Sequence, residues 1–407
     1  MIGALGAAAP AAAAGAGAAE IRFAPCTLTH PTHIVAVEAQ CGRLAVPENP
    51  AAPRGRQIEL FVARIPAVSL RKRPDPLFVL AGGPGQAATT FYTAAAGPLA
   101  RIHRDRDIIL VDQRGTGRSN GLFCSLDNDA PWRASDATLV TDARRCLTAL
   151  SRHADVAYYT TSLAVRDLDR VRAALGYPTI DLYGESYGTR VALEYVRRFP
   201  FRVRAAILDG VVPPQAALGE TLPLDAQSAL ERIFARCLAD GACRTAFGDP
   251  MDAYRSLRGE LDRSPVPVRV ANPTTGEPVS FDFTALHLIA VLRLGSYTSE
   301  QAALLPFSLH EADARGDFGP LASQFLLLDR TYENAIASGM NNTVVCTEDV
   351  PFWSEALDSA RLARTYLGAS QLDALKRVCA IWPHGPIDPD FHAPLKGMTP
   401  LMLLSGT

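Results

Sequence analysis

Apolar runs that end in polar, glycine-rich turns organise the first half of the chain. The run IELFVARIPA at 58–67 alternates and is rich in branched residues, which predicts a strand. Two shorter apolar runs, LFVL at 77–80 and IILV at 108–111, each stop at a glycine-rich segment. This form is typical of buried parallel strands that carry loops at their carboxyl ends. Residues 87–102, between these two runs, have a helical pattern.

The same alternation continues as far as residue 212. Residues 161–175 place apolar side chains at helical spacing and are followed by Gly176, a helix stop. TIDLY at 179–183 and VRAAILDG at 203–210 then predict strands on either side of another helix. Strands that alternate with helices predict an α/β fold, with a mostly parallel sheet and helices on both faces.

The strand pattern disappears between residues 213 and 340. Four stretches in this region have helical patterns: 225–240, 251–262, 283–294 and 299–313. The strand pattern resumes at PLMLLSG, residues 400–406. We therefore expect residues 20–212 and 341–407 to build the sheet domain, with an inserted helical cap or lid at 213–340.

Composition limits the classes of partner. Of 407 residues, 48% are apolar and 20% are charged, so the chain can bury a sizeable core and is not disordered as a whole. The net charge of −2 argues against nucleic acid or an anionic membrane surface as the main partner. Beyond the N-terminus, no stretch approaches the ~20 apolar residues of a membrane span.

Residues 1–19 are almost all small and apolar, which is typical of a secretory signal segment. They have no Lys or Arg near Met1, and the alternative interpretation is an Ala/Gly-rich tail. Under the first interpretation the protein is secreted or periplasmic.

Cysteine usage also favours export. The eight cysteines lie in neighbouring pairs, which predicts four disulfides by proximity: Cys26 with Cys41, Cys124 with Cys146, Cys237 with Cys243, and Cys346 with Cys379. The alternative is a cytosolic enzyme with eight buried thiols. No CxxC occurs and no Cys/His spacing resembles a zinc site, so we expect neither a metal nor another cofactor.

One motif carries the chemistry. Gly184-Glu185-Ser186-Tyr187-Gly188 fits G-x-S-x-G, with an apolar strand before it and a helix after it. In such a nucleophile elbow the serine occupies a strained turn that presents its hydroxyl above the sheet edge. The two glycines avoid collisions with the neighbouring strand and helix. We therefore predict that Ser186 is a catalytic nucleophile; the alternative is a structural turn serine.

An oxyanion hole is the second requirement of this chemistry. One donor is the backbone amide after the nucleophile, here that of Tyr187. The other comes from the loop after the third strand, here Gly82-Gly83-Pro84-Gly85. Because proline has no amide, Gly83 is the first candidate and Gly82 the second. No GK[ST] follows these glycines, which excludes a phosphate-binding loop.

Three motifs together resemble the prolyl and tripeptidyl aminopeptidase family of the α/β-hydrolase fold: AGGPG at 81–85, VDQRGTGRS at 111–119 and GESYGT at 184–189. The cysteines and VVCTEDVP at 344–351 resemble its exported tripeptidyl branch. Ala81 and Tyr187 stand where the prolyl enzymes usually have histidine and tryptophan, which also favours the tripeptidyl branch. The resemblance implies hydrolysis of peptides from a free N-terminus through an acyl-enzyme.

A carboxylate must then hold the ammonium group of the substrate. Glu185, Glu348 and Asp349 are the candidates, and structural or solvated acids are the alternative interpretation. For Asp112 and the arginines of the 112–119 loop we favour a structural network.

The resemblance places the remaining triad members late in the chain. In this fold the order is Ser, then Asp or Glu, then His. The resemblance locates the acid just past the strand at 400–406 and the histidine farther on, both beyond Thr407. Asp209, which follows the next strand after the elbow, is an alternative acid, although a turn-capping role is favoured. His384 and His392 precede the last strand, so we expect neither to be the base.

Three hypotheses therefore compete. The first is an exported serine aminopeptidase that acts on peptides. The second is an esterase or other acyl hydrolase for a small-molecule substrate, because the same elbow serves many acyl groups. The third is an inactive, truncated protein of the same fold that has lost its base.

Overall fold

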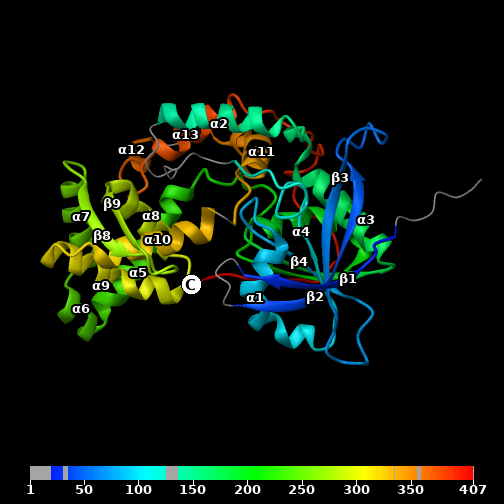
Figure 1. The fold of residues 1–407 in the computed structure, drawn as a ribbon, viewed down its shortest axis with the longest axis horizontal. Helices are drawn as coiled ribbons and strands as arrows, with labels where there is room; N and C mark the ends of the chain where they lie inside the picture. Colours follow the sequence, from blue (N-terminus) through cyan, green and yellow to red (C-terminus); the bar gives the residue numbers. More distant parts are fainter. Residues whose placement is uncertain (1–19, 31–34, 125–135, 334, 355–358, 407) are drawn as a thin grey trace, which may run out of the picture.

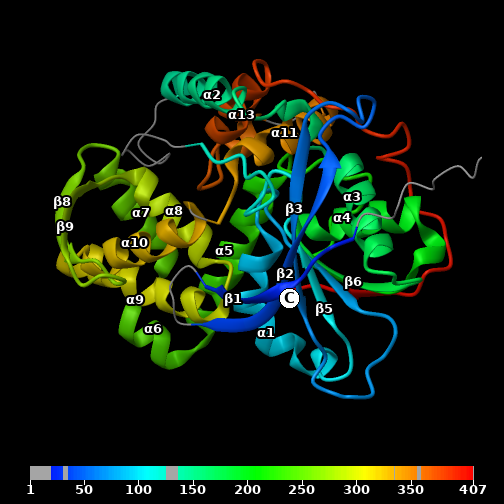
Figure 2. The same ribbon diagram turned by 45° about the vertical axis from the view of Figure 1, so that its right-hand side comes forward.

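The computed structural model describes residues 20–30, 35–124, 136–333, 335–354 and 359–406. The predicted signal-like segment 1–19 lies outside the described residues. An eight-stranded sheet with helices on both sides forms one part of the molecule, and a mainly helical block lies beside it (Figures 1 and 2).

The sheet has the strand order β1-β2-β3-β5-β4-β6-β7-β10. Strands β5, β4, β6, β7 and β10 are parallel neighbours, and β1 to β3 pair antiparallel at one side. The bounds are β1 Ala24–Thr29, β2 Ala36–Pro47, β3 Gln57–Ile65, β4 Leu77–Leu80, β5 Ile108–Val111, β6 Ile180–Glu185, β7 Val203–Asp209 and β10 Leu401–Leu404. This arrangement confirms the predicted α/β fold class.

Alternate residues of the central strands bury opposite faces of the sheet. On one face, Leu77 and Val79 of β4 share an apolar cluster with Phe91 of α1 (Ala88–His103). On the other face, Phe78 and Leu80 share a cluster with α3 (Thr161–Ala174) and α4 (Tyr187–Arg198). Every residue of β4 and β5 is buried, which explains their uninterrupted apolar sequences.

The helical block has its own apolar cluster, separate from that of the sheet domain. Its helices are α5 Leu222–Ala239, α6 Gly241–Phe247, α7 Pro250–Leu261, α8 Ala285–Gly295, α9 Ser299–Arg315 and α10 Gly319–Glu333. It also contains an antiparallel hairpin, β8 Val266–Ala271 with β9 Pro278–Phe283, where sequence patterns indicated no strand. Both strands are short and each contains a proline, which weakens the strand signal.

From about residue 337 the chain packs again with the sheet domain, because Met340, Val344 and Trp382 belong to the same apolar cluster as β4 and β6. The helices of this region are α11 Ser338–Glu348, α12 Ser359–Leu362 and α13 Ser370–Cys379. Helices α11 and α13 lie together with α2 (Asp136–Leu150) at one end of the molecule (Figures 1 and 2).

All eight cysteines are paired as their proximity in the sequence predicted. The disulfides join β1 to β2, the segment after β5 to α2, α5 to α6, and α11 to α13. In the described part of the chain, no helix combines the length and the apolar character that a membrane crossing requires.

Candidate active site

Ser186 occupies a strained turn between β6 and α4. Its backbone φ is 53° and its ψ is −122°, a conformation that costs a non-glycine residue about 1–3 kcal/mol. Among the described residues, Asn120 is the one other non-glycine residue with a positive φ. The Ser186 amide donates to the Asp209 carbonyl oxygen at 2.8 Å, which fixes the turn against the end of β7.

The two glycines of the motif permit a close approach of three backbone segments. A Cβ atom at Gly184 would lie 2.4 Å from the Gly188 carbonyl oxygen, and one at Gly188 would lie 2.2 Å from the carbonyl oxygen of Leu80. Real Cβ atoms essentially never approach an atom this closely. The absence of side chains at both positions therefore lets α4 start directly against β4 and β6.

The glycine-rich loop after β4 lies beside Ser186. A Cβ atom at Gly82 would be 3.2 Å from the Ser186 Cβ and 3.7 Å from its Oγ, so the backbone of Gly82 borders the serine side chain. The Asn341 side chain donates to the Pro84 carbonyl oxygen at 2.9 Å, and the Ala337 amide donates to that of Gly85 at 2.9 Å. The start of α11 therefore holds this loop in place.

The chain is similar to known hydrolases and proteases. Residues 75–236 match the family model described as the alpha/beta hydrolase fold. The serine protease Hip1 of Mycobacterium tuberculosis is 27% identical over 419 residues, which cover 95% of this chain and 79% of that protein. A tripeptidyl aminopeptidase of Streptomyces coelicolor is 33% identical over 192 residues, covering 43% of this chain and 35% of that protein. This chain is a serine hydrolase of the α/β-hydrolase fold. A carboxylesterase B of M. tuberculosis is also similar, with 27% identity over 381 residues, 85% of this chain and 70% of that protein.

Hydrogen bonds to its hydroxyl group anchor the Tyr187 side chain inside the protein. The ring is buried, and its hydroxyl accepts a hydrogen bond from Gln113 Nε2 at 3.0 Å. The same hydroxyl lies 2.5 Å from Thr161 Oγ1 at the start of α3. Burial raises the pKa of the Tyr187 hydroxyl, so it remains protonated.

Two of the three candidate amine-binding acids are engaged inside the protein. Glu348 is fully buried, and its two carboxyl oxygens accept hydrogen bonds from the Thr161 amide at 2.7 Å and the Thr161 hydroxyl at 2.8 Å. Asp349 is also fully buried; it pairs with Arg190 at 2.7 Å and accepts from the Leu218 amide at 2.6 Å. Burial raises the pKa of both acids, to about 8 for Glu348. Neither carboxyl group is available at the surface of the site.

Glu185 and Asp209 lie next to each other beside the serine. They are register partners at the carboxyl ends of β6 and β7, and both are partly exposed. Burial and then the charge of Asp209 raise the pKa of Glu185. Asp209 accepts a hydrogen bond from the Tyr183 hydroxyl at 2.9 Å. Glu185 directly precedes Ser186 in the chain, and the Asp209 carbonyl oxygen accepts the hydrogen bond from the Ser186 amide.

The loop after β5 has the contacts of a structural network. Asp112 is buried and accepts from the amides of Thr89 and Arg118, each at 3.0 Å. Burial raises the pKa of Asp112, and these hydrogen bonds oppose the rise. Arg114, also buried, forms an ion pair with Asp167 of α3 at 2.6 Å. The loop is thereby fastened to α1 and α3.

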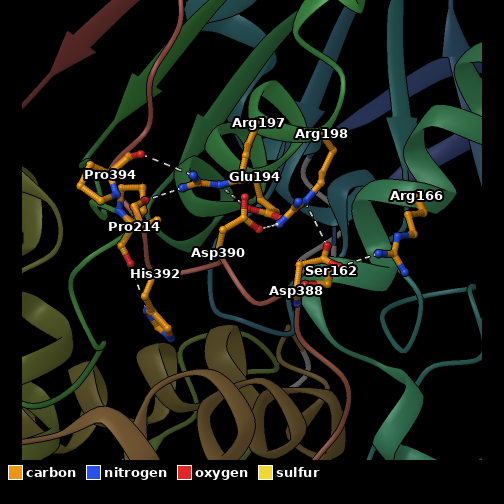
Figure 3. Close-up of polar contacts among 11 residues, drawn as sticks. Ser162, Arg166, Glu194, Arg197, Arg198, Pro214, Asp388, Asp390, His392 and Pro394 are labelled. Carbon is orange, nitrogen blue, oxygen red and sulfur yellow. Dashed lines mark hydrogen bonds and ion pairs between the residues drawn. The ribbon is translucent and has the colours of Figure 1, made fainter.

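Neither late histidine forms a hydrogen bond with the serine. His384 Nε2 lies 3.3 Å from the Cys379 carbonyl oxygen. His392 Nδ1 lies 3.1 Å from the carbonyl oxygen of Pro214 (Figure 3). Burial lowers the pKa of His392. Within the described part of the chain, the Ser186 hydroxyl makes no hydrogen bond to any histidine.

The acids near these histidines have arginine partners on the helices of the sheet domain (Figure 3). Asp388 pairs with Arg166 of α3 at 2.6 Å and with Arg198 of α4 at 3.0 Å. Asp390 also pairs with Arg198. The proline-rich loop before β10 is therefore fixed across α3 and α4, and its acids have structural partners.

Three residues that support the site did not stand out in the sequence. Gln113 and Thr161 hold the Tyr187 hydroxyl, and Arg190 joins α4 to Asp349. The sequence indicates Thr161 only as the start of a helical stretch, and in the structure it is the first residue of α3, after the N-cap Thr160. For metal binding, no group of three or more His, Cys, Asp or Glu side chains with suitable placement exists among the described residues.

Proposed function

We propose that this hydrolase cleaves peptides from a free N-terminus through an acyl-enzyme on Ser186. The observation that carries the proposal is the strained Ser186 at the end of β6, with Gly82 beside its side chain and the start of α4 behind it. The serine oxygen attacks the carbonyl carbon as its proton passes to a base. The amine then leaves with a proton, and water releases the acyl group.

The oxyanion formed in this reaction needs two donors. We assign them to the backbone amide of Tyr187 and to that of Gly83, with Gly82 as the second choice. The N-terminus of α4 adds favourable potential for the developing negative charge. Removal of one such donor typically lowers kcat about 10²–10³-fold.

The peptidase assignment draws on the relatives. Hip1 is named as a serine protease and the Streptomyces protein as a tripeptidyl aminopeptidase, although the latter match covers only 35% of that protein. For the substrate ammonium group we propose Glu185, because Glu348 and Asp349 are buried and have other partners. The adjacent Asp209 strengthens the negative potential at this point.

We further propose that the protein is exported. Its four disulfides support this, because disulfides form and persist in oxidising compartments. They join neighbouring elements in both the sheet domain and the helical block, so reducing conditions would loosen both parts.

A second candidate function is ester hydrolysis, favoured by the similarity to carboxylesterase B. The two candidates differ in what the site requires of the substrate. A peptidase that acts from the N-terminus needs a free ammonium group, whereas an esterase is indifferent to it.

The deciding experiment compares N-terminally free and N-blocked tripeptide chromogenic amides with a chromogenic acyl ester. Ser186→Ala is the control for serine-dependent turnover, and Glu185→Gln tests the amine site. The assay is run on the full protein. Turnover of the free tripeptide alone, lost in Ser186→Ala, is the expected result. Turnover of the ester alone would contradict the peptidase proposal and favour the esterase.

A further inference from the structure

A continuous chain of hydrogen bonds links the residue after the nucleophile to a buried acid on a distant helix. Gln113 donates to the Tyr187 hydroxyl at 3.0 Å, and that hydroxyl lies 2.5 Å from Thr161 Oγ1. Thr161 in turn donates its hydroxyl and its amide to the two carboxyl oxygens of Glu348, at 2.8 and 2.7 Å. Tyr187, Thr161 and Glu348 are all buried, so water does not compete for these bonds.

The next residue makes a second connection to the same helix. Asp349 forms a buried ion pair with Arg190, which stands three positions after Tyr187 in α4. Residues three apart share a helix face. The adjacent acids Glu348 and Asp349 therefore hold two positions on the first turn of α4. Glu348 holds Tyr187 through Thr161, and Asp349 holds Arg190 directly.

The segment that carries these acids is cross-linked to its neighbours. They stand at the end of α11, where the Cys346–Cys379 disulfide joins this helix to α13. The start of α11 also holds the glycine loop through Asn341 and Pro84. One helix thus supports both backbone segments to which the proposed function assigns the oxyanion donors.

We propose that Thr161 and Glu348 are positioning residues, which orient the backbone amide of Tyr187 toward the oxyanion by fixing the Tyr187 side chain. The inference rests on the proposed function of Ser186 and Tyr187. An apolar side chain could fill the same space without buried polar partners. The polar chain instead fixes where the end of the Tyr187 ring lies, and with it the orientation of the first residue of α4.

The test uses three near-isosteric variants, Tyr187→Phe, Thr161→Val and Glu348→Gln. The matched control is Tyr195→Phe, because Tyr195 lies on the same helix, is buried, and donates its hydroxyl to Asp169 at 3.0 Å. We expect each test variant to lower kcat about 10- to 100-fold with KM changed less than twofold, since an oxyanion donor acts in the transition state. Binding of a peptide aldehyde should weaken by the factor lost in kcat/KM.

Two kinetic outcomes would overturn the proposal. In the first, Glu348→Gln and Tyr187→Phe have the same kcat as the control Tyr195→Phe. The other is a loss that falls on KM alone. Thr161→Val and Glu348→Gln interrupt the same chain, so their combination should lose far less than the product of the single losses. Tyr187→Phe removes one oxygen atom and keeps the test possible if Glu348→Gln does not fold.

A second measurement does not need activity. The chain has 11 tyrosines, and selective ¹⁵N-tyrosine labelling gives one amide signal for each. The signal missing from Tyr187→Phe identifies Tyr187. Glu348→Gln should shift this signal, and Tyr195→Phe should leave it in place. An unmoved signal would overturn the positioning role. Absence of Ser186-dependent turnover in the wild type, with the signal shifted, would instead refute the proposed function alone.

Discussion

The close approach of α4 to the end of β4 can be tested by adding a single methyl group to Gly188. In Gly188→Ala the new Cβ would lie 2.2 Å from the carbonyl oxygen of Leu80 and 2.8 Å from that of Ala81. Both obstacles are backbone atoms at the end of β4, so no flexible side chain can move away. Helix α4 and strand β4 must separate by roughly 1 Å to accommodate the methyl group.

The cost follows from what α4 buries. Residues 187–196 of this helix are all buried, and six of them belong to the apolar cluster that also contains residues of β4 and β6. A gap of 0.5–1 Å forfeits about a quarter to a half of each dispersion contact, and overpacking of this kind typically costs about 1–3 kcal/mol. We expect Gly188→Ala to lower the free energy of unfolding by about 3 kcal/mol, because both atoms that the methyl group meets belong to the backbone. Activity should fall as well, because Ser186 precedes the displaced turn.

Gly259→Ala is the matched control. Gly259 lies within α7, and a Cβ there would meet no atom within 4 Å. Alanine in a helix interior is favoured over glycine by about 0.5–1 kcal/mol, so this variant should be slightly stabilised. Urea unfolding of both variants measures the difference. A Gly188→Ala protein within about 0.5 kcal/mol of wild type would refute the packing argument.

Three further changes test the buried charges and a disulfide. Burial raises the pKa of Glu348 from 4.5 to about 8, against the charge of Arg190, so the folded protein keeps this proton after the unfolded chain has lost it. Wild-type stability relative to Glu348→Gln should therefore fall between pH 4.5 and 8, by at most about 4–5 kcal/mol, and a pH-independent difference in urea unfolding would contradict this. Arg190→Met leaves Asp349 buried without its cation and should cost about 3–5 kcal/mol, much of it recovered in Arg190→Met/Asp349→Leu; equal unfolding midpoints for the wild type and Arg190→Met would argue otherwise. Replacing Cys346 and Cys379 by alanine removes a link that spans 33 residues and should cost about 3–4 kcal/mol in the same assay, unless the unfolded chain stays compact.

The sequence was most informative where one physical requirement acts on consecutive residues. Strand β4 is fully buried, so all its residues are apolar, and the predicted run at 77–80 coincides with it. The elbow was predictable because G-x-S-x-G places two glycines where side chains would collide. The hairpin β8–β9 was missed because alternate residues are only half-buried, and its prolines weakened the pattern.

Contacts between distant segments left no local signal. Thr161 and Glu348 are 187 positions apart, and nothing around either residue indicates that they meet. Glu348 was one of three candidates for the substrate ammonium group, with a structural or solvated acid as the alternative interpretation. Its burial, and the two hydrogen bonds from Thr161, became visible only in the folded chain.

The contacts of Asp349 join helix α4 to the connection that leads into the helical block. Arg190 donates to the carbonyl oxygen of Ala216 at 2.5 Å, and the Leu218 amide donates to Asp349 at 2.6 Å. Residues 216–218 lie between β7 and α5, on the path from the sheet domain to the block. A displacement of this connection must therefore either break buried charge-assisted hydrogen bonds or move Arg190, one turn beyond Ser186. Because broken bonds of this kind leave a buried charge uncompensated, these contacts hold the connection to the start of α4.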